Sequence, residues 1–275
     1  MSDACALRML PAIKMQAFEA DQVICSKGDK RQPFSYVLYG IVICSGGPSE
    51  NGALNPVNIF GSGTWFGEAS FLNQQASGFN YLCLAPTRLV SIPFEHALAA
   101  FEQEAEFSRF IARLTNWRNQ EHAEMLALMR TGSPAQCVVM GLAMLADAML
   151  NNSSHLPKNL AGESLEIPLK QSLLASMCGV SRGIFSACIQ QLAAAGWLNI
   201  NYATVELKPV KTWQQFAATQ RQNQQRLTKL AMPEILALMQ LAADHASPAI
   251  SHTAPKTKEL NPLNNAHSQA PGVTQ

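Results

Sequence analysis

The sequence predicts an α+β protein with an N-terminal barrel or roll of short strands, a long helix and a C-terminal winged helix-turn-helix. Three observations predict this order. Residues 18–92 contain short β-type segments separated by Gly, Pro and Asn. Residues 94–130 contain neither Gly nor Pro and repeat apolar residues at helical spacing. Residues 171–207 combine two short helical patterns, a tight turn and a hairpin.

The composition is that of a folded protein. Of 275 residues, 48% are hydrophobic and 14% are charged, which is enough apolar material for real cores. The net charge of +1 points to no particular partner. Between residues 156 and 230, however, eight Lys and Arg residues stand against three Glu residues, a local excess of five positive charges. This excess hints at a polyanion partner, although solvated basic surfaces are also common.

The sequence favours a cytoplasmic protein with reduced cysteines. Its apolar stretches are interrupted well before the roughly 20 residues that a membrane-spanning helix needs, and residues 1–12 lack the apolar core of a secretory signal. We therefore expect no membrane partner.

No C-x-x-C pair occurs, so we expect small buried thiols without a metal and keep a thiol sensor as the alternative. The cysteines are Cys5, Cys25, Cys44, Cys83, Cys137, Cys178 and Cys188.

The first strands can be placed individually. Residues 36–39 and 41–44 are apolar runs on either side of Gly40, and residues 89–92 have the pattern of a closing strand. Glycines between such segments suit tight turns, where a positive φ is needed. Short strands with this spacing indicate a barrel or roll.

Residues 94–132 form the predicted long helix. Its apolar residues recur every three to four positions, so it can pack against a symmetry-related copy as in a coiled coil. The alternative is a helix that docks on its own domain. Ser133 and Pro134 then suit the N-cap and first turn of the next helix. The two lines of the expected dimer seam are Phe107, Leu114 and Glu121 against Phe110, Trp117 and Glu124.

Residues 171–190 carry the pattern of a helix-turn-helix. Ala175 allows two helices to cross closely, and Gly179 allows the tight turn between them. The positions expected between the helices are apolar or small, namely Leu174, Ala175, Cys178, Val180, Phe185 and Cys188. The positions expected to face outward are polar or small, namely Ser181, Arg182, Gly183, Ser186, Ala187 and Gln190.

The outward face of the second helix suits a DNA major groove. Ser181 is a good N-cap, and the first helical turn would present N–H groups to phosphate. Arg182 could bind guanine through two hydrogen bonds or clamp a phosphate. The plain alternative is a helical hairpin without DNA contact, because Ala and Gly at this spacing also occur by chance. Agreement of the inward and outward positions favours DNA binding.

The segments after the second helix predict a wing and a helical extension. Gly196 ends the helix, and residues 200–207 have the pattern of a β-hairpin with its tip at 201–203. Residues 222–246 are amphipathic, although Pro233 should interrupt them. An exposed loop is expected at 151–163. The expected parts are 1–93 (strands), 94–132 (long helix), 133–212 (winged helix-turn-helix), 213–246 (helical extension) and 247–275 (disordered tail).

Four motifs carry a resemblance to a known family. They are F-x-A-x-Q-V-I-x-x-x-G-D at 18–29, Y-V-L-Y-G-I-V at 36–42, G-T-W-F-G-E-A-S at 63–70, and I-P-L-K-Q through G-V-S-R at 167–182. With them the chain resembles the CRP/FNR family of regulators. The resemblance implies a cyclic-nucleotide-binding-like, double-stranded β-roll (jelly-roll-like), a dimerisation helix and a winged helix that binds a palindromic promoter site. The DNA-binding residues expected on this basis are Lys170, Gln171, Ser172, Ser181, Arg182, Gly183, Ser186 and Gln190.

The ligand site that the resemblance implies departs from the family pattern. Members that bind cyclic AMP carry Gly-Glu for the ribose hydroxyls and, later, Arg-Ser for the phosphate. Gly67 and Glu68 match the first pair and are the candidate ligand-binding residues, but Gly78 and Phe79 stand at the second. Because residues 32–87 contain no basic residue, a phosphate would lack a charged partner, and cyclic AMP is disfavoured. The effector is unknown or lost.

Two further family features are missing. Cys5 and Cys25 cannot supply the cysteine cluster of an iron–sulfur sensor, and no haem signature occurs, so no cofactor is expected. Many family members carry an acidic residue and a second arginine where this chain has Gly183 and Ala187. Fewer base contacts, and more reliance on phosphates and DNA shape, would follow.

We therefore expect a homodimeric transcription regulator that binds double-stranded DNA, with RNA polymerase as a further partner. The alternative is a protein-interaction regulator of the same descent that no longer binds DNA and engages a partner through its C-terminal helix. An enzyme is not expected, because the sequence contains no Ser/His/Asp arrangement, G-x-x-x-x-G-K or H-E-x-x-H.

Overall fold

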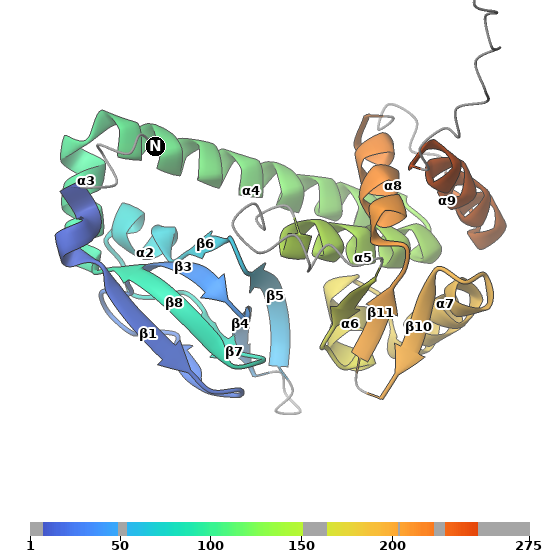
Figure 1. The fold of residues 1–275 in the computed structure, drawn as a ribbon, viewed down its shortest axis with the longest axis horizontal. Coiled ribbons are helices and arrows are strands. Elements are labelled where there is room, and N and C mark those ends of the chain that lie inside the picture. The colour runs from blue at the N-terminus through green and yellow to red at the C-terminus, as the bar shows by residue number, and fades with distance from the viewer. Residues whose placement is uncertain (1–7, 49–53, 151–163, 203, 223–228, 247–275) are drawn as a thin grey trace, which may run out of the picture.

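A computed structural model describes residues 8–48, 54–150, 164–202, 204–222 and 229–246. Two units lie side by side, and a long helix runs along both of them (Figure 1). The N-terminal unit is built mainly of strands, and the C-terminal unit is a winged helix-turn-helix with additional helices. The predicted α+β organisation is confirmed.

The N-terminal unit is a β-roll made of two antiparallel four-stranded sheets. The first sheet contains, in spatial order, β1 (Lys14–Phe18), β8 (Thr87–Ile92), β3 (Phe34–Tyr39) and β6 (Trp65–Phe66). The second contains β2 (Val23–Cys25), β7 (Asn80–Cys83), β4 (Ile41–Pro48) and β5 (Leu54–Gly61). Two short helices complete the unit, η1 (Leu10–Ala12) and α2 (Glu68–Asn73). The apolar segments predicted at 36–39, 41–44 and 89–92 lie in β3, β4 and β8.

The predicted long helix is broken into two. α3 (Phe94–Gln103) and α4 (Ala105–Thr131) meet at Glu104, whose backbone is extended (φ −110°, ψ 98°). Ser108 Oγ stabilises the break by donating hydrogen bonds to the carbonyl oxygens of Phe101 (2.5 Å) and Glu104 (3.1 Å). No Gly or Pro marks this position, so helical periodicity alone could not locate the break.

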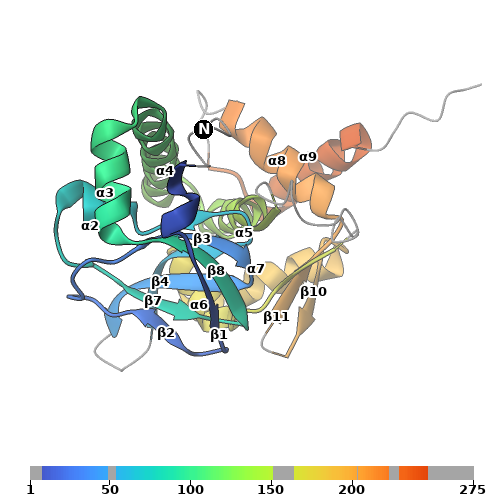
Figure 2. The same ribbon diagram turned by 60° about the vertical axis from the view of Figure 1, so that its left-hand side comes forward.

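The N-terminal end of the predicted dimer seam is buried within its own chain. Phe107 is fully buried, with its ring centroid 6.0 Å from that of Phe34 and 6.3 Å from that of Phe71. Phe110 lies 6.0 Å from Trp65. This aromatic cluster lies where α2, α3 and the first turns of α4 meet the roll (Figure 2). A seam through Phe107 and Phe110 is therefore wrong, because both rings pack against their own roll.

The winged helix-turn-helix has the predicted elements. After α5 (Pro134–Leu150), α6 (Gln171–Met177) and α7 (Arg182–Ala194) are bent by 102° relative to each other, within the usual range for this motif. The wing consists of β10 (Leu198–Asn201) and β11 (Thr204–Leu207), which pair antiparallel. A third strand that the sequence did not predict, β9 (Leu165–Ile167), pairs with β11.

The predicted start of α5 is confirmed by a reciprocal cap. Ser133 Oγ accepts a hydrogen bond from the Gln136 N–H (3.1 Å), and Gln136 Oε1 accepts one from the Ser133 N–H (2.7 Å). Two backbone donors that the helix leaves unpaired are satisfied in this way.

The C-terminal extension consists of α8 (Val210–Gln222) and α9 (Met232–Ala246). The predicted stretch 222–246 is interrupted next to Pro233, as expected, because residues 229–231 are not helical and α9 begins at Met232. Pro233 itself lies in the first turn of α9, where its missing N–H costs nothing. Ile235, Met239 and Ala242 on α9 are buried in the core of the C-terminal unit. The predicted loop at 151–163 and tail at 247–275 lie outside the described residues.

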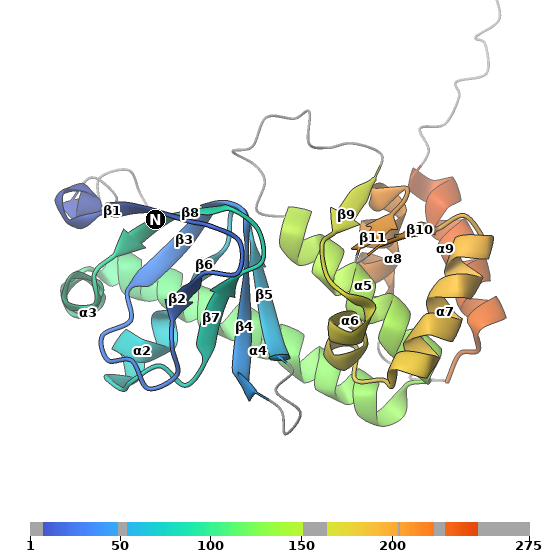
Figure 3. The ribbon, with the colours of Figure 1, turned by 90° about the horizontal axis from the view of Figure 1, so that it is seen from below.

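The roll and the C-terminal unit share apolar contacts. β5 packs against α5 and α6, and Figure 3 shows these elements facing one another between the two units. Ile43 and Ile59 of the roll are buried in the same cluster as Leu142 and Leu174. Among the described residues, no single helix is long and apolar enough to cross a membrane.

Candidate nucleic-acid interface and ligand site

The first turn of α7 is exposed and stands on a buried support. Ser181 Oγ accepts a hydrogen bond from the Ile184 N–H at 3.3 Å and so caps the helix, as predicted. Ser181, Arg182 and Gly183 are exposed, whereas Phe185 behind them is fully buried. The helix start and the Arg182 guanidinium are thus accessible to a phosphate or a base edge.

The inward and outward positions of the helix-turn-helix follow the predicted pattern closely. Gly179 makes the turn with φ 68°, and a Cβ at this position would lie 2.7 Å from Cε of Met129. Val180 and Ser186 are half-buried. The remaining inward positions are buried, namely Leu174, Ala175, Cys178, Phe185 and Cys188. The remaining outward positions are exposed, namely Ser181, Arg182, Gly183, Ala187 and Gln190.

The residues predicted to bind DNA lie at two places in this unit. Lys170 is the N-cap of α6 and is exposed, and Gln171 and Ser172 begin that helix. The others lie at the N-cap and along α7, namely Ser181, Arg182, Gly183, Ser186 and Gln190. Both places remain accessible, which a DNA-binding role requires.

The wing adds a candidate contact that the sequence reasoning missed. Tyr202, at the tip of the hairpin, is fully exposed. Behind it, Asn199 Nδ2 donates a hydrogen bond to Glu206 Oε2 across the two strands (2.7 Å). Hydrogen bonds from Ser164 and Asn199 hold the pKa of Glu206 below its ordinary value. The hairpin pattern placed Tyr202 at the tip, and only its role as a contact was not predicted.

We expect Gly183→Ala to stabilise the protein. Gly183 lies in the first turn of α7, and an added Cβ would meet nothing within 4 Å. Alanine loses less backbone freedom on folding, so the free energy of unfolding should rise by up to about 1 kcal/mol. Urea denaturation measures this change. Gly179→Ala is the matched control and should destabilise, because its φ is positive and its Cβ would collide; a loss of stability at 183 would contradict the open geometry.

Inside the roll, Glu68 forms a buried ion pair with a residue that the sequence reasoning missed. Glu68 Oε1 accepts a hydrogen bond from Nη1 of Arg118, which lies on α4, fifty residues later. Nη2 of the same guanidinium donates to the carbonyl oxygen of Trp65. The guanidinium carbon lies 5.2 Å from the centroid of the Phe60 ring. A side chain of α4 therefore reaches into the roll.

The surroundings of this ion pair are buried and include the side chains of Cys44 and Tyr81. Burial raises the pKa of the Cys44 thiol to about 12 and raises the pKa of the Tyr81 phenol above its ordinary value. The two charges act on Cys44 in opposite directions, since Glu68 raises its pKa and Arg118 lowers it. Water and salt screen an ion pair weakly in such surroundings.

The described cysteines are buried thiols. All six are free and buried, as predicted, and burial raises their pKa values. A reactive sensor thiol needs access and a lowered pKa, so the thiol-sensor alternative is disfavoured for these six. Cys5 lies outside the described residues.

Known proteins share this architecture. Residues 15–104 match the family model described as the cyclic nucleotide-binding domain. The structure is similar to that of a CRP/FNR-family transcriptional regulator from Thermus thermophilus, with 19% identity, a TM-score of 0.57, and coverage of 74% of this chain and 98% of that one. The chain has the CRP/FNR fold.

Two further structures share the CRP/FNR fold. FixK2 from Bradyrhizobium japonicum is 13% identical, with a TM-score of 0.58 and coverage of 73% of this chain and 95% of that one. The c-di-GMP-responsive global regulator CLP from Xanthomonas campestris is 16% identical, with a TM-score of 0.54 and coverage of 75% and 99%. No curated protein sequence matches this chain. Likeness at these identities establishes the fold, and residue roles depend on the geometry.

The predicted ligand residues Gly67 and Glu68 lie in the roll, but residues 32–87 supply no basic side chain to accompany them. Gly67 has φ 95°, and a Cβ there would lie 2.4 Å from the carbonyl oxygen of Pro33, so this position requires glycine. Gly78 and Phe79 are exposed. The basic group near Glu68 is Arg118, which lies four residues after Leu114 and seven after Ile111, on the face of α4 that packs against the roll. A charged residue in line with these apolar residues is the sequence signal that could have identified it.

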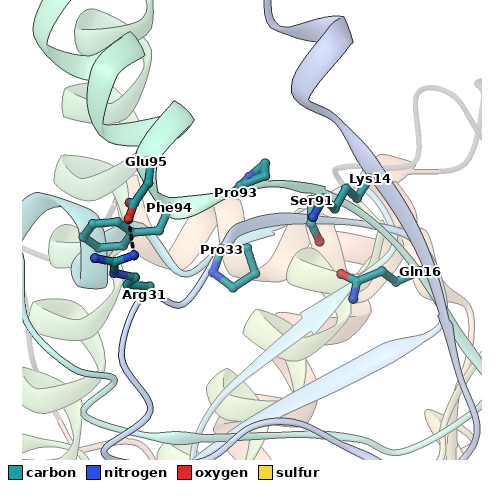
Figure 4. A pocket seen from close by; sticks show the side chains of 8 residues that line it. All are labelled: Lys14, Gln16, Arg31, Pro33, Ser91, Pro93, Phe94 and Glu95. Atoms are coloured by element: carbon teal, nitrogen blue, oxygen red, sulfur yellow. Dashed lines mark ion pairs between the residues drawn. The ribbon is translucent and has the colours of Figure 1, made fainter.

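A separate cleft lies on the outside of the roll. It has a volume of about 320 Å³ and is bordered by β1, β8 and the start of α3 (Figure 4). Arg31 and Glu95 form an ion pair of 2.9 Å at one side of it. The residues lining it are Lys14, Gln16, Arg31, Pro33, Ser91, Pro93, Phe94 and Glu95. Neither predicted ligand residue, Gly67 or Glu68, is among them.

Proposed function

We propose that this protein is a transcription regulator of the CRP/FNR type that binds a palindromic promoter site in duplex DNA as a homodimer. The observation that carries the proposal is the exposed, capped first turn of α7, held from behind by the buried Phe185. A helix about 10–12 Å across fits the major groove, which is about 12 Å wide. The fold similarity supports the same conclusion.

Each contact would have a distinct role in this complex. Arg182 and Gln190 are exposed on α7 and would contact base edges. Lys170 and Lys211 are exposed at the starts of α6 and α8 and would bind phosphates, which fix the position of the protein but carry little sequence information. Tyr202 would extend the contact from the wing.

The outer face of α4 is the proposed dimer interface. Because Phe107 and Phe110 pack on the roll, we infer that the partner meets the part of α4 that follows these two residues. The large apolar side chains exposed there are Trp117 of the predicted seam, Leu126 and Met129. Sedimentation equilibrium should give a mass near twice 29.9 kDa; a monomer at micromolar concentration would contradict the dimer.

A salt titration tests DNA binding. Each phosphate neutralised by the protein contributes about −0.9 to the slope of log affinity against log salt concentration. If Lys170 and Lys211 of both subunits each neutralise one phosphate, the slope should be about −3.6. Fluorescence anisotropy with a labelled promoter fragment measures it. A flat response would overturn the proposal and favour a protein-interaction role.

The alternative protein-interaction role depended on the C-terminal helix. In the structure, Ile235, Met239 and Ala242 of α9 are buried in its own unit, although Leu241 remains 55% exposed. The apolar stripe therefore has a partner within the chain. This packing makes DNA binding the better supported function.

Two finer points belong to the same proposal. We infer that the dimer acts in the cytoplasm and contacts RNA polymerase at the promoter, which in vitro transcription with the purified polymerase tests.

We also infer that cyclic AMP is not the effector, because residues 32–87 contain no basic residue and Glu68 is already paired with Arg118. Calorimetric titration with cyclic AMP should give no binding heat.

A further inference from the structure

We propose that the Arg118 side chain is a built-in cationic ligand of the β-roll: it occupies the interior next to Glu68 and holds α4 against the roll without a small-molecule effector. This goes beyond the proposed regulation of transcription. It concerns the roll and α4 alone, and its test requires no DNA, so either proposal can fail without the other.

The geometry around Arg118 matches a planar guanidinium group. Its two terminal nitrogens donate to two acceptors that are close in sequence, Glu68 Oε1 and the carbonyl oxygen of Trp65. A guanidinium presents several donors in one plane, so it can satisfy both at once, which a lysine ammonium does less well. The Phe60 ring lies 5.2 Å from the guanidinium carbon and adds a cation–π contact.

The site needs a cation. Both Glu68 and Arg118 have side chains only 11% exposed. Glu68 Oε2 is buried and has no hydrogen-bond partner within the part of the chain that the structure describes. A buried carboxylate left without its charge partner is strongly destabilising. Arg118 therefore compensates a charge that the roll would otherwise bury unpaired.

An anionic effector does not fit the same interior. It would have to enter next to the Glu68–Arg118 ion pair, whose guanidinium is already paired, and residues 32–87 supply no further basic side chain to bind it. Like charges at short range in an apolar interior repel strongly. The structure thus assigns the space next to Glu68 to a guanidinium cation.

The consequence is a fixed position for α4. This helix, Ala105–Thr131, leads from the roll to α5 and the DNA-binding unit. Arg118 lies in its middle and ties it to β6 and α2 through Trp65 and Glu68. The joint is made by the chain itself, so the arrangement of roll and helix is present in the absence of any added molecule.

Chemical rescue of Arg118→Ala in the full-length protein tests the proposal. Removing the guanidinium should lower Tm by roughly 6–20 °C, because one partner of a buried ion pair is lost. N-ethylguanidinium, the part of the side chain that the substitution removes, should restore much of this loss at millimolar concentration by binding the folded state. Ethylammonium and cyclic AMP should not. Arg113→Ala, an exposed arginine of the same helix, is the control and should show neither effect.

A second variant separates this proposal from a general effect of the cation. In the double variant Glu68→Gln/Arg118→Ala, the Tm increase with N-ethylguanidinium should be largely lost, because the carboxylate that holds it is neutral. Equal rescue of both variants, or rescue by ethylammonium as strong as that by N-ethylguanidinium, would overturn the proposal. If Arg118→Ala does not fold, the wild-type protein decides: a Tm increase with cyclic AMP would show that the interior accepts an anion and would also overturn it.

Discussion

Phe185→Ala is expected to lower the free energy of unfolding of the C-terminal unit by about 3–5 kcal/mol, the usual range for truncating a buried phenylalanine. Phe185 is fully buried and belongs to the core that joins α6, α7 and α5. The lost ring removes apolar burial and leaves a cavity directly behind the exposed turn of α7. Urea denaturation followed by tryptophan fluorescence suits this measurement, because Trp197 and Trp213 are buried in the same core.

The neighbouring Ile184 provides a matched control. It lies on the same helical turn but is 40% exposed, so Ile184→Ala should cost well under half as much stability as Phe185→Ala. DNA binding by the Phe185→Ala variant should weaken together with the stability of α7. A Phe185→Ala variant as stable as the wild type would show that α7 does not stand on this core.

Arg182→Ala is expected to weaken binding to the promoter site by about 1–3 kcal/mol, or roughly 5- to 150-fold in Kd, the range for a good contact to a base. Arg182 is the first residue of α7 and is exposed. Removing its side chain should leave the fold intact, because no part of the core depends on it. Anisotropy titrations with the promoter site and with unrelated DNA measure the change in affinity and in specificity.

Arg88→Ala is the control for the loss of one positive charge. Arg88 is exposed on β8 of the roll, outside the proposed interface, so its replacement should leave Kd nearly unchanged. If Arg182→Ala bound the promoter as tightly as the wild type, the assignment of α7 as the recognition helix would be wrong. If it lost affinity equally for all DNA, Arg182 would contact a phosphate and not a base.

Features that depend on neighbouring residues could be predicted from the sequence. The caps at Ser133 and Ser181 each involve a partner three residues away, and the turn at Gly179 requires a positive φ that glycine adopts without strain. The alternation of buried and exposed positions in α6 and α7 follows from helical periodicity. Such signals are short-range, so they can be recognised without knowing the rest of the fold.

Features that depend on packing could not be predicted from the sequence. The break at Glu104 has no Gly or Pro, and it is stabilised by the contacts of Ser108 and by the aromatic cluster that α3 and α4 join. The apolar stripe of α4 predicted that this face of the helix is buried, but not which surface covers it. Either the roll of the same chain or a second subunit could bury these side chains. Only the folded chain shows that Phe107 belongs to the roll.

By itself, the sequence determined the order of the roll, the helix and the winged helix-turn-helix, and it identified the residues at the start of α7. The tertiary structure decided what fills the roll. Glu68 and Arg118 lie fifty residues apart on different elements, and no local pattern connects them. Their pairing arises because a buried carboxylate must be compensated by whichever cation the fold brings within reach.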